Sequence, residues 1–525
     1  MHLRSRGTAG TAAPLTFWEG LALVAVVGLA LALRVAFVIF TDSIAEDAFI
    51  TFRYVRNLIG GLGFVYNRGQ PVLGTTTPLF TLLLAALGTL GVSPIVSARV
   101  VGGIADAVSV CLVFSTVRRF TRSARWGLFA ALVYATNAPA VVWSVSGMET
   151  ALFTLWLVLA LTLLSADRPV GAALAAALAM LTRPEGALLA GVVMSLVAFT
   201  SGRDLLRVGG VLVACTAPWL LWAYLRFGDV VPQSVRAKMD LYPTAWGAQH
   251  LLYDGVHRLL GYGYAIIGIA ILRLPYFVQV ALSASAWLTV ILIVAGLVLR
   301  GPTRPYAAWA LFLIVSYALY SRVTLPFLWY WVPLGPLAVV FLVGATADLA
   351  SIDRPAALRA LARACVWVAC TAVLLLNAAT LAGGFAVSRN VRDYDAALWE
   401  SAGRWLQSHA PADASVCLEH IGYVGFYSER TIVDTSGLVS PEVVRFDQQL
   451  PVRGNEPQRL LALLQSPVIV CDYFVPPRTL LNEIRRVATA GELAGLDAAF
   501  QQVAAFEYTG RMLPYVAPFG GGGRW

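Results

Sequence analysis

Long apolar runs recur along this chain up to about residue 386, and they constrain its fold more than any other feature. The run from 17 to 40 is long enough to cross the hydrocarbon core of a bilayer, which takes about 20 residues of helix. Hydrophobic residues make up 58% of the sequence and charged residues 13%, about half the charged share usual in soluble domains. The chain is therefore predicted to be a polytopic α-helical membrane protein.

The placement of arginine predicts the orientation. The first apolar run reads as a retained helix, because it exceeds a typical signal-peptide core and no small-residue cleavage site follows it. The net charge of +9 does not indicate nucleic acid, because the basic residues fall in alternate loops. These clusters comprise Arg4, Arg6, Arg118, Arg119, Arg122, Arg125, Arg203, Arg207, Arg300, Arg304, Arg354, Arg359 and Arg363. By the positive-inside rule they are cytoplasmic, together with the N-terminus.

This orientation constrains the apolar stretch at 77–92. If that stretch crossed the membrane, the arginines at 118–125 would lie outside. The stretch is also short, so we expect an interfacial or re-entrant helix that closes a large external loop at about 41–96. Further crossings are predicted at about 97–117, 126–143, 148–166, 169–182, 186–201, 208–225, 276–299, 305–321, 327–347 and 364–386. The total is about eleven, which places the two termini on opposite faces.

The chain becomes polar beyond about residue 388, where helix-like and strand-like segments alternate. We therefore predict a transmembrane module at 1–387 and an exported α/β domain at 388–525. Cys417 and Cys471 fall in predicted strands of that domain. An exported compartment permits disulfides, but we expect two separate thiols here and not a bond. No CxxC or HxH pattern occurs, so we expect no zinc site.

The external loop begins with a predicted amphipathic helix, EDAFITFRYVRNL. Its apolar face carries Phe49, Phe52, Val55 and Ile59 and is expected to rest on the membrane. Asp47 and Tyr54 lie on another face, toward the aqueous mouth of the protein. A carboxylate there can take a proton from an acceptor hydroxyl or bind a cation. Alternatively, Glu46 and Asp47 only cap the helix, because acids are favoured in a first turn.

Four cations fall in predicted external loops, against the positive-inside rule: Arg183, Arg236, Lys238 and Arg322. Each can serve as a lipid-headgroup anchor or as a ligand for a donor phosphate. Lys238 is the only lysine among 38 basic residues. Its compact ammonium suits a phosphate that is held as a point charge, so it is the preferred candidate.

Other polar and aromatic residues are candidates for a substrate groove: Tyr54, Glu149, Glu185, Trp329 and Tyr330. The two glutamates either cap helices or face the substrate. The two rings belong to an interfacial aromatic belt or form a platform for a sugar or prenyl chain.

Two further sets of residues complete the candidates. Inside the membrane, Arg34 and Asp106 are expected to pair for structural reasons. In the exported domain, residues available to an acceptor glycan are Glu419, His420, Tyr427 and Asp434, most of which read as strand and turn residues.

Several segments together resemble the bacterial GT-C glycosyltransferases, and among them the actinobacterial terminal arabinofuranosyltransferases. They are EDAFITFRYVRNL, GLGFVYNRGQPVLGTTTPL, SGMETAL, LTRPEG, RFGDVVPQSVRAKM and PFLWYWVPLGP, spread over about residues 40–335. The resemblance implies a multi-pass protein of the bacterial cell membrane with its active site at the exported face. Its activity would be transfer of a sugar, such as arabinofuranose, from a polyprenyl-phosphate donor to a glycan, lipid or protein acceptor of the cell envelope.

The resemblance also implies site roles. The acid pair after the first span would supply the catalytic base, where relatives usually show two aspartates. Asp47 is then the base, and Glu46 is a helper or a ligand for a divalent cation such as Mg or Mn. No cofactor is otherwise expected.

Two other functions stay open. A flippase or transporter of a lipid-linked sugar would be expected to place its polar groups near the bilayer midplane, whereas these cluster on one face. A non-catalytic glycan sensor would not need the acid pair.

Overall fold

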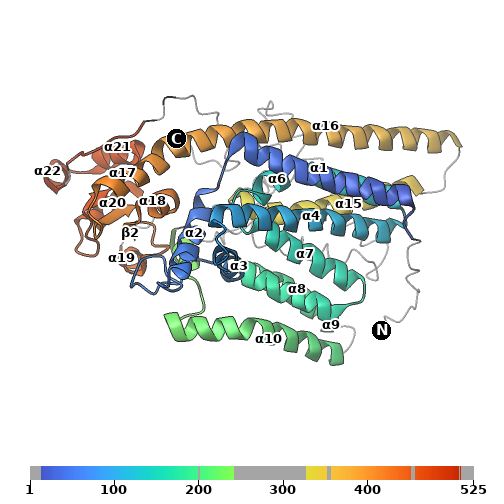
Figure 1. Cartoon of the computed structure of the whole chain (residues 1–525), viewed down its shortest axis with the longest axis horizontal. Coiled ribbons are helices and arrows are strands. Elements are labelled where there is room, and N and C mark those ends of the chain that lie inside the picture. Colours follow the sequence, from blue (N-terminus) through green and yellow to red (C-terminus); the bar gives the residue numbers. More distant parts are fainter. Residues whose placement is uncertain are drawn as a thin grey trace.

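The computed structural model describes residues 14–198, 202–241, 312, 327–351, 356–450, 456–499, 501–507 and 509. An elongated bundle of helices forms most of it, and a smaller portion with a β-sheet lies at one end (Figure 1). The predicted span 276–299 lies outside the described residues, as do Arg322 and all of the predicted span 305–321 except residue 312.

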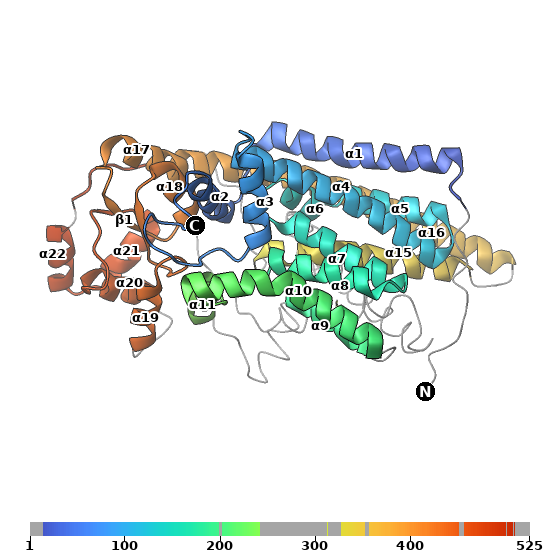
Figure 2. The same ribbon diagram turned by 60° about the horizontal axis from the view of Figure 1, so that its bottom comes forward.

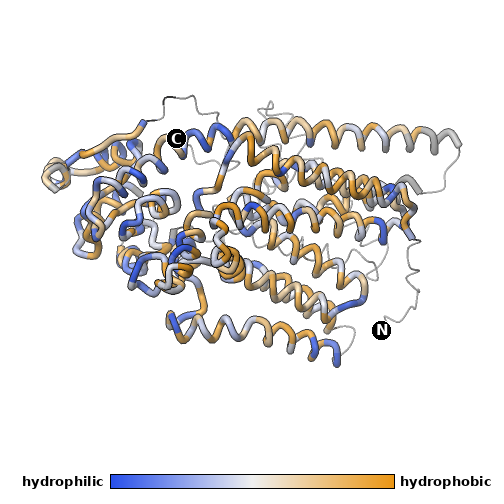
Figure 3. Tube along the Cα trace, viewed as in Figure 1, coloured by the Kyte–Doolittle hydropathy of each residue, from blue (hydrophilic) through white to orange (hydrophobic). Residues whose placement is uncertain are grey.

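The helices of the bundle follow the apolar runs of the sequence. They are α1 (Phe17–Thr41), α4 (Pro94–Thr121), α5 (Ala124–Ala135), α6 (Ala138–Ser144), α7 (Thr150–Ser165), α8 (Pro169–Thr182), α9 (Gly186–Ala198), α10 (Gly202–Phe227), α15 (Gly335–Ser351) and α16 (Ala356–Asp395). Figure 3 shows hydrophobic residues along these helices and hydrophilic residues gathered toward the ends of the bundle.

Within the described ranges, four helices are long and apolar enough to cross a membrane, or five if α5 and α6 count as one bent span. The break between α5 and α6 bends the chain by 58°. Asn137 caps α6 by accepting a hydrogen bond from the Ala140 N–H, and Pro139 follows in its first turn. The chain is thus a multi-pass membrane protein, while eleven crossings stay a prediction.

Helix α3 (Pro78–Gly88) lies across the bundle near the start of α4 (Figure 2). Its 11 residues rise about 16 Å, well short of the roughly 30 Å hydrocarbon core. This agrees with the predicted interfacial or re-entrant helix.

The expected pair of Arg34 and Asp106 is confirmed inside the bundle, with the guanidinium 2.5 Å from the carboxylate and both side chains 2% exposed. Tyr134 donates to the same carboxylate at 2.8 Å, and Arg34 donates to the Ala135 carbonyl. A charge in this environment is costly unless it is paired, and these contacts pair both charges.

The described residues from 396 onwards, called the C-terminal portion, have the predicted α/β character. Their helices are α17 (Ser401–His409), α18 (Ile421–Ser428), α19 (Pro441–Gln449), α20 (Glu456–Gln465), α21 (Arg478–Val487) and α22 (Ala490–Ala499). The strands β1 (Ser415–Leu418), β2 (Thr431–Asp434) and β3 (Tyr473–Phe474) form a parallel sheet in the order β2-β1-β3. Val416 pairs with Ile432 on one side and Tyr473 on the other.

The helical chain continues from α16 through a π-helical turn (Ala396–Glu400) into α17. The predicted boundary between residues 387 and 388 therefore falls inside α16, and this helix joins the bundle to the C-terminal portion.

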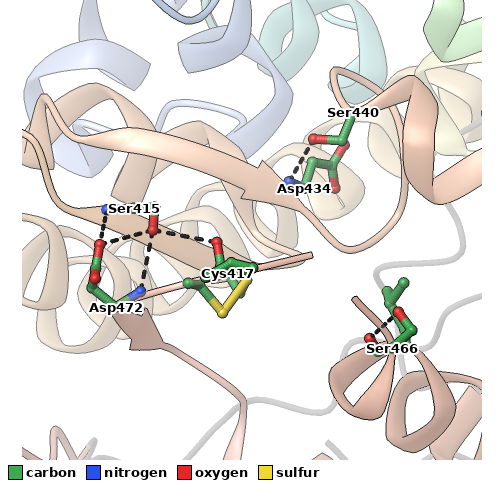
Figure 4. Close-up of a disulfide and its surroundings, with 9 residues drawn as sticks. Ser415, Cys417, Asp434, Ser440, Ser466 and Asp472 are labelled. Atoms are coloured by element: carbon green, nitrogen blue, oxygen red, sulfur yellow. Dashed lines mark hydrogen bonds between the residues drawn. A yellow bond between two sulfur atoms is a disulfide. The ribbon is translucent and has the colours of Figure 1, made fainter. Parts of the chain in front are cut away.

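Cys417 and Cys471 form a disulfide, with their Cα atoms 5.7 Å apart (Figure 4). The expectation of two separate thiols was wrong. The bond joins β1 to the segment that enters β3, and Asp472 beside it accepts hydrogen bonds from the backbone and side chain of Ser415. Sequence spacing could not show that these two strands are neighbours.

Helix α2 (Glu46–Ile59) packs its apolar face against α18, so the expectation that this face rests on the membrane was wrong. The ring of Phe49 is 1% exposed and lies 4.2 Å from Tyr423 and 5.3 Å from Phe426, centroid to centroid. An amphipathic helix needs a partner for its apolar face, but the pattern does not say which one.

Polar contacts reinforce this packing. Arg53 of α2 donates to the carbonyl oxygens of Gly425 at 2.6 Å and Arg430 at 2.7 Å. The Tyr66 hydroxyl donates to the Ile421 carbonyl at 2.6 Å. All these groups are buried or partly buried, so the loop after α1 and the C-terminal portion are packed as one structure.

Candidate active site

Asp47 and Lys238 approach each other where α2 begins. Lys238 lies on α11 (Gln233–Leu241), and its Nζ is 4.0 Å from Asp47 Oδ2. The side chains of Lys238 and Asp47 are 29% and 31% exposed. Gln233 anchors α11 by donating its backbone N–H to Leu73 and its side chain to Gly437. These contacts of its first residue hold α11 where its lysine lies beside the acidic first turn of α2.

Glu46 is held by the C-terminal portion. Its Oε1 accepts the Gly422 backbone N–H at 2.5 Å, and a Cβ on Gly422 would collide with the Glu46 carbonyl oxygen. Burial raises the pKa of Glu46 well above its usual value, and the neighbouring charge of Asp47 raises it further. The raised pKa favours the protonated form of Glu46, whereas a metal ligand has to be ionised.

Arg183 is buried between two carboxylates. It lies 2.8 Å from Glu185 and 3.6 Å from Glu149. Burial raises the pKa of Glu149, although the charge of Arg183 acts to lower it. Glu185 is buried too, but the charge and hydrogen bonds of Arg183 outweigh burial there, so the pKa of Glu185 is lowered. The guanidinium also covers the ring of Tyr330 at 4.6 Å. Its positive charge is therefore already balanced.

Aromatic rings form a row beside these cations. Phe327 and Trp329 stack with centroids 4.6 Å apart and planes 8° apart, and Trp329 is 6.2 Å from Tyr330. Trp329 also touches Trp143 at 5.2 Å, while Lys238 Nζ is 5.2 Å from the Phe327 ring centroid. The predicted rings Trp329 and Tyr330 thus lie within the same cluster as Arg183 and Lys238.

Two predicted site residues lie apart from this cluster. Tyr54 is completely buried, its hydroxyl donates to the Val72 carbonyl at 2.7 Å and accepts the Gly74 N–H at 2.8 Å, and burial raises its pKa. The expectation that Tyr54 lines a groove was wrong, because it fastens the loop instead. Arg236 is 52% exposed and pairs with Asp229. It is two positions from Lys238, a spacing that places side chains on different faces of a helix.

The C-terminal portion adds His420 to the site, at the N-terminus of α18. Its ring stacks on Trp399 with centroids 4.2 Å apart and planes 9° apart. Burial lowers the pKa of His420 to about 4, although the nearby charge of Asp47 acts to raise it. The sequence placed His420 among residues available to a glycan, but gave no sign of Trp399 or of Gly422.

The other residues of that set serve the C-terminal fold. Asp434 accepts the N–H groups of Ser436, Leu438 and Val439, as expected of a turn residue. Tyr427 stacks with Tyr423, and Glu419 is exposed.

Among the residues that the structure describes, no three His, Cys, Asp or Glu side chains come together as a metal site. Glu46 and Asp47 are adjacent, and one of them is committed to Gly422.

Comparisons with known proteins bear on both parts of the chain. Residues 389–516 match a family model described as "Domain of unknown function (DUF8728)". The terminal beta-(1->2)-arabinofuranosyltransferase of Mycobacterium tuberculosis (strain ATCC 25618 / H37Rv) is 32% identical over 239 residues, which cover 40% of this chain and 37% of that protein. The match thus spans little more than a third of the relative's length.

Among solved structures, the crystal structure of ArnT from Cupriavidus metallidurans bound to undecaprenyl phosphate is similar with a TM-score of 0.54 at 15% identity. The similarity covers 83% of this chain and 88% of that one. The S. cerevisiae protein O-mannosyltransferase Pmt1-Pmt2 complex bound to the sugar donor gives a TM-score of 0.33 at 16% identity, over 42% of this chain and 36% of that one. The chain thus shares its fold with ArnT, and part of its sequence is similar to a terminal arabinofuranosyltransferase.

Proposed function

We propose that this protein is an integral membrane glycosyltransferase that moves a sugar from a polyprenyl-phosphate donor to a cell-envelope acceptor at the exported face. The observation that carries the proposal is the approach of Lys238 to Asp47 at the end of an apolar bundle, where a lipid-linked substrate can enter. The relatives support it, since one is named for arabinofuranosyl transfer and another was crystallised with undecaprenyl phosphate. Arabinofuranose is therefore the proposed sugar, and an envelope glycan the proposed acceptor, ahead of a lipid or a protein.

In the proposed reaction, the oxygen of an acceptor hydroxyl attacks the anomeric carbon of the donor sugar. The bond from that carbon to the phosphate oxygen breaks, and the polyprenyl phosphate leaves with the bonding electrons. Asp47 takes the hydroxyl proton. Asp47 fits this role better than Glu46, because the raised pKa of Glu46 favours its protonated form and its carboxyl group holds Gly422.

Lys238 is the proposed contact for the departing phosphate. A positive charge placed where negative charge develops lowers the barrier to departure. Arg183 is less suited to this task because Glu149 and Glu185 balance its charge, and Arg236 is paired with Asp229. Arg183 instead positions the ring of Tyr330.

The aromatic row of Phe327, Trp329 and Tyr330 is the proposed wall for the donor's sugar or first prenyl units. Flat aromatic faces pack against the apolar faces of sugars and against isoprenoid chains with little entropy loss. Lys238 Nζ lies over the Phe327 ring of this row, which supports a phosphate contact beside the proposed wall.

Two observations support an exported site. The Cys417–Cys471 disulfide belongs to the C-terminal portion, and disulfides persist in oxidising compartments. The arginines around 118–125 and 203–207 lie where α4 ends and α10 begins, at the end of the bundle away from α2 (Figure 1). By the positive-inside rule that end is cytoplasmic, with the N-terminus.

The proposal is tested with purified protein, polyprenyl-phosphate [14C]arabinofuranose and an octyl-linked arabinofuranosyl disaccharide. Label should pass to the disaccharide and unlabelled polyprenyl phosphate should be released. A flippase would instead move the labelled lipid between leaflets of a proteoliposome without producing labelled disaccharide. A glycan sensor would bind the disaccharide and leave the donor intact.

A further inference from the structure

We propose that His420 binds the acceptor, offering its Nδ1 to a hydroxyl of the acceptor sugar beside Asp47. The inference rests on the proposed function and names a residue of its acceptor side. The C-terminal portion would then contribute a substrate contact as well as a cover for α2.

The first observation is a buried polar atom without a partner. His420 Nδ1 is closed off from solvent and makes no hydrogen bond with any residue that the structure describes. His420 is the N-cap residue of α18, yet its side chain makes no capping hydrogen bond. A buried polar atom without a hydrogen bond is unfavourable, so this nitrogen calls for a ligand or a bound water.

The second observation is the position of the ring. Strand β1 ends at Leu418, and after two intervening residues the chain starts α18, whose Gly422 N–H meets Glu46. This brings the imidazole close enough to Asp47 for the carboxylate to act on its pKa. The stacking on Trp399, in the π-helical turn after α16, fixes the plane of the ring.

The third observation concerns the chemistry of the ligand. Burial keeps the imidazole neutral, with one ring nitrogen as donor and the other as acceptor. A sugar hydroxyl both donates and accepts, so it satisfies Nδ1 in either tautomer. A donor phosphate calls for a cation, which α11 already supplies through Lys238. His420 therefore matches the hydroxyl-bearing acceptor.

The chain contains a matched control within the same portion. His409 stacks on Trp405 with centroids 4.7 Å apart and planes 9° apart, nearly the geometry of His420 on Trp399. Its Nδ1, however, lies at 2.8 Å from the Ser408 hydroxyl and 3.0 Å from the Trp405 carbonyl, at the exposed end of α17. The two histidines thus differ in whether Nδ1 is occupied.

Full-length protein in detergent, with the octyl-linked arabinofuranosyl disaccharide as the acceptor probe, tests the inference. His420→Phe keeps a ring against Trp399 and removes both nitrogens. It should raise the calorimetric Kd and the KM for the disaccharide at least about tenfold, the effect of one lost hydrogen bond, while the donor KM stays within about twofold. His420→Gln should recover part of the affinity, and His409→Phe should change neither constant.

An unchanged disaccharide Kd and KM in His420→Phe would overturn the inference. So would a parallel rise of donor and acceptor KM with a lower melting temperature in both His420 variants, because that pattern indicates a structural role. So would a wild-type protein with no saturable disaccharide binding. If the wild-type protein binds disaccharide through His420 yet transfers no sugar, the proposed function fails and the glycan site stands.

Discussion

Glu46 of the first loop accepts the backbone N–H of Gly422 at 2.5 Å, although 376 positions separate the two residues. This contact brings the start of α18 to the start of α2, and with it His420 to Asp47. Both sides of the proposed reaction therefore depend on how the C-terminal portion docks.

Gly422→Ala should weaken that docking. The added Cβ meets the Glu46 backbone, so the substitution should lower stability by about 1–3 kcal/mol, although alanine is the better helix former. Gly491→Ala in α22 is the control, since nothing lies within 4 Å of the position. Melting of the purified variants in detergent measures the difference, and equal midpoints would show that the Glu46–Gly422 approach does not limit stability.

Asp47→Asn should reduce sugar transfer at least about a hundredfold, because the amide keeps the size of the side chain but cannot take a proton. Glu46→Gln should retain activity within about tenfold, since glutamine resembles the protonated acid and can still accept the Gly422 N–H. Initial rates with saturating donor check both variants. The reverse order of damage would make Glu46 the base.

Lys238→Ala should raise the donor KM or lower turnover by roughly tenfold to a hundredfold, the equivalent of about 1.5–3 kcal/mol for one charge-assisted phosphate contact. Lys238→Arg should rescue only partly, because a planar guanidinium does not occupy the same point. Arg236→Ala, on the same helix but paired with Asp229, serves as the control. Full equivalence of arginine would reduce Lys238 to a headgroup anchor.

Acid should destabilise the protein partly through His420. Its pKa is lowered from 6.5 to about 4 on folding, so between these values the unfolded chain binds a proton that the folded chain excludes. Stability from this group is therefore full above about pH 6.5 and is lost as the pH falls toward 4. His420→Phe should flatten the melting temperature in that window, whereas His409→Phe should follow the wild type.

Single cysteines should report the orientation. In a protein that keeps Cys417 and Cys471 but lacks the other four cysteines, Arg122→Cys should react with an impermeant maleimide only after the membrane is opened. Asp413→Cys, at an exposed position of the C-terminal portion, should react in intact cells. Labelling of both from outside would contradict the proposed topology.

The sequence was sufficient to predict what depends on local pattern. Apolar runs located the helices of the bundle, and α3, which the arginine rule predicts not to span, has only 11 residues. The cost of buried charge predicted the Arg34–Asp106 pair, because each residue had one plausible partner at similar depth. Asp47, Lys238, Arg183 and Tyr330 were selected by chemistry, and the fold brings them to one end of the bundle.

What depends on long-range contact could not be predicted. Phe49 indicates that α2 has an apolar face, but such a face fits a lipid partner as well as a protein partner. Only the fold shows that α18 covers this face. Tyr54 lies beside the acid pair in sequence, but its hydroxyl is used by Val72 and Gly74. The Cys417–Cys471 bond and the stacking of Trp399 on His420 depend on strand order and on a π-helical turn, neither of which has a sequence signature here.

The continuous helical chain from α16 into α17 determines how far the C-terminal portion lies from the bilayer. The 40 residues of α16 span about 60 Å, roughly twice the hydrocarbon thickness of a bilayer. Its far end carries the π-helical turn that holds Trp399 and, through it, His420. Because a continuous helix and not a flexible linker joins the two parts, the distance between the bilayer and the point where an acceptor would bind is fixed. A glycan that extends from the cell surface would have to bring its end to that distance from the bilayer. The distance that an acceptor can span along the membrane normal would therefore select among acceptors before any sugar is recognised.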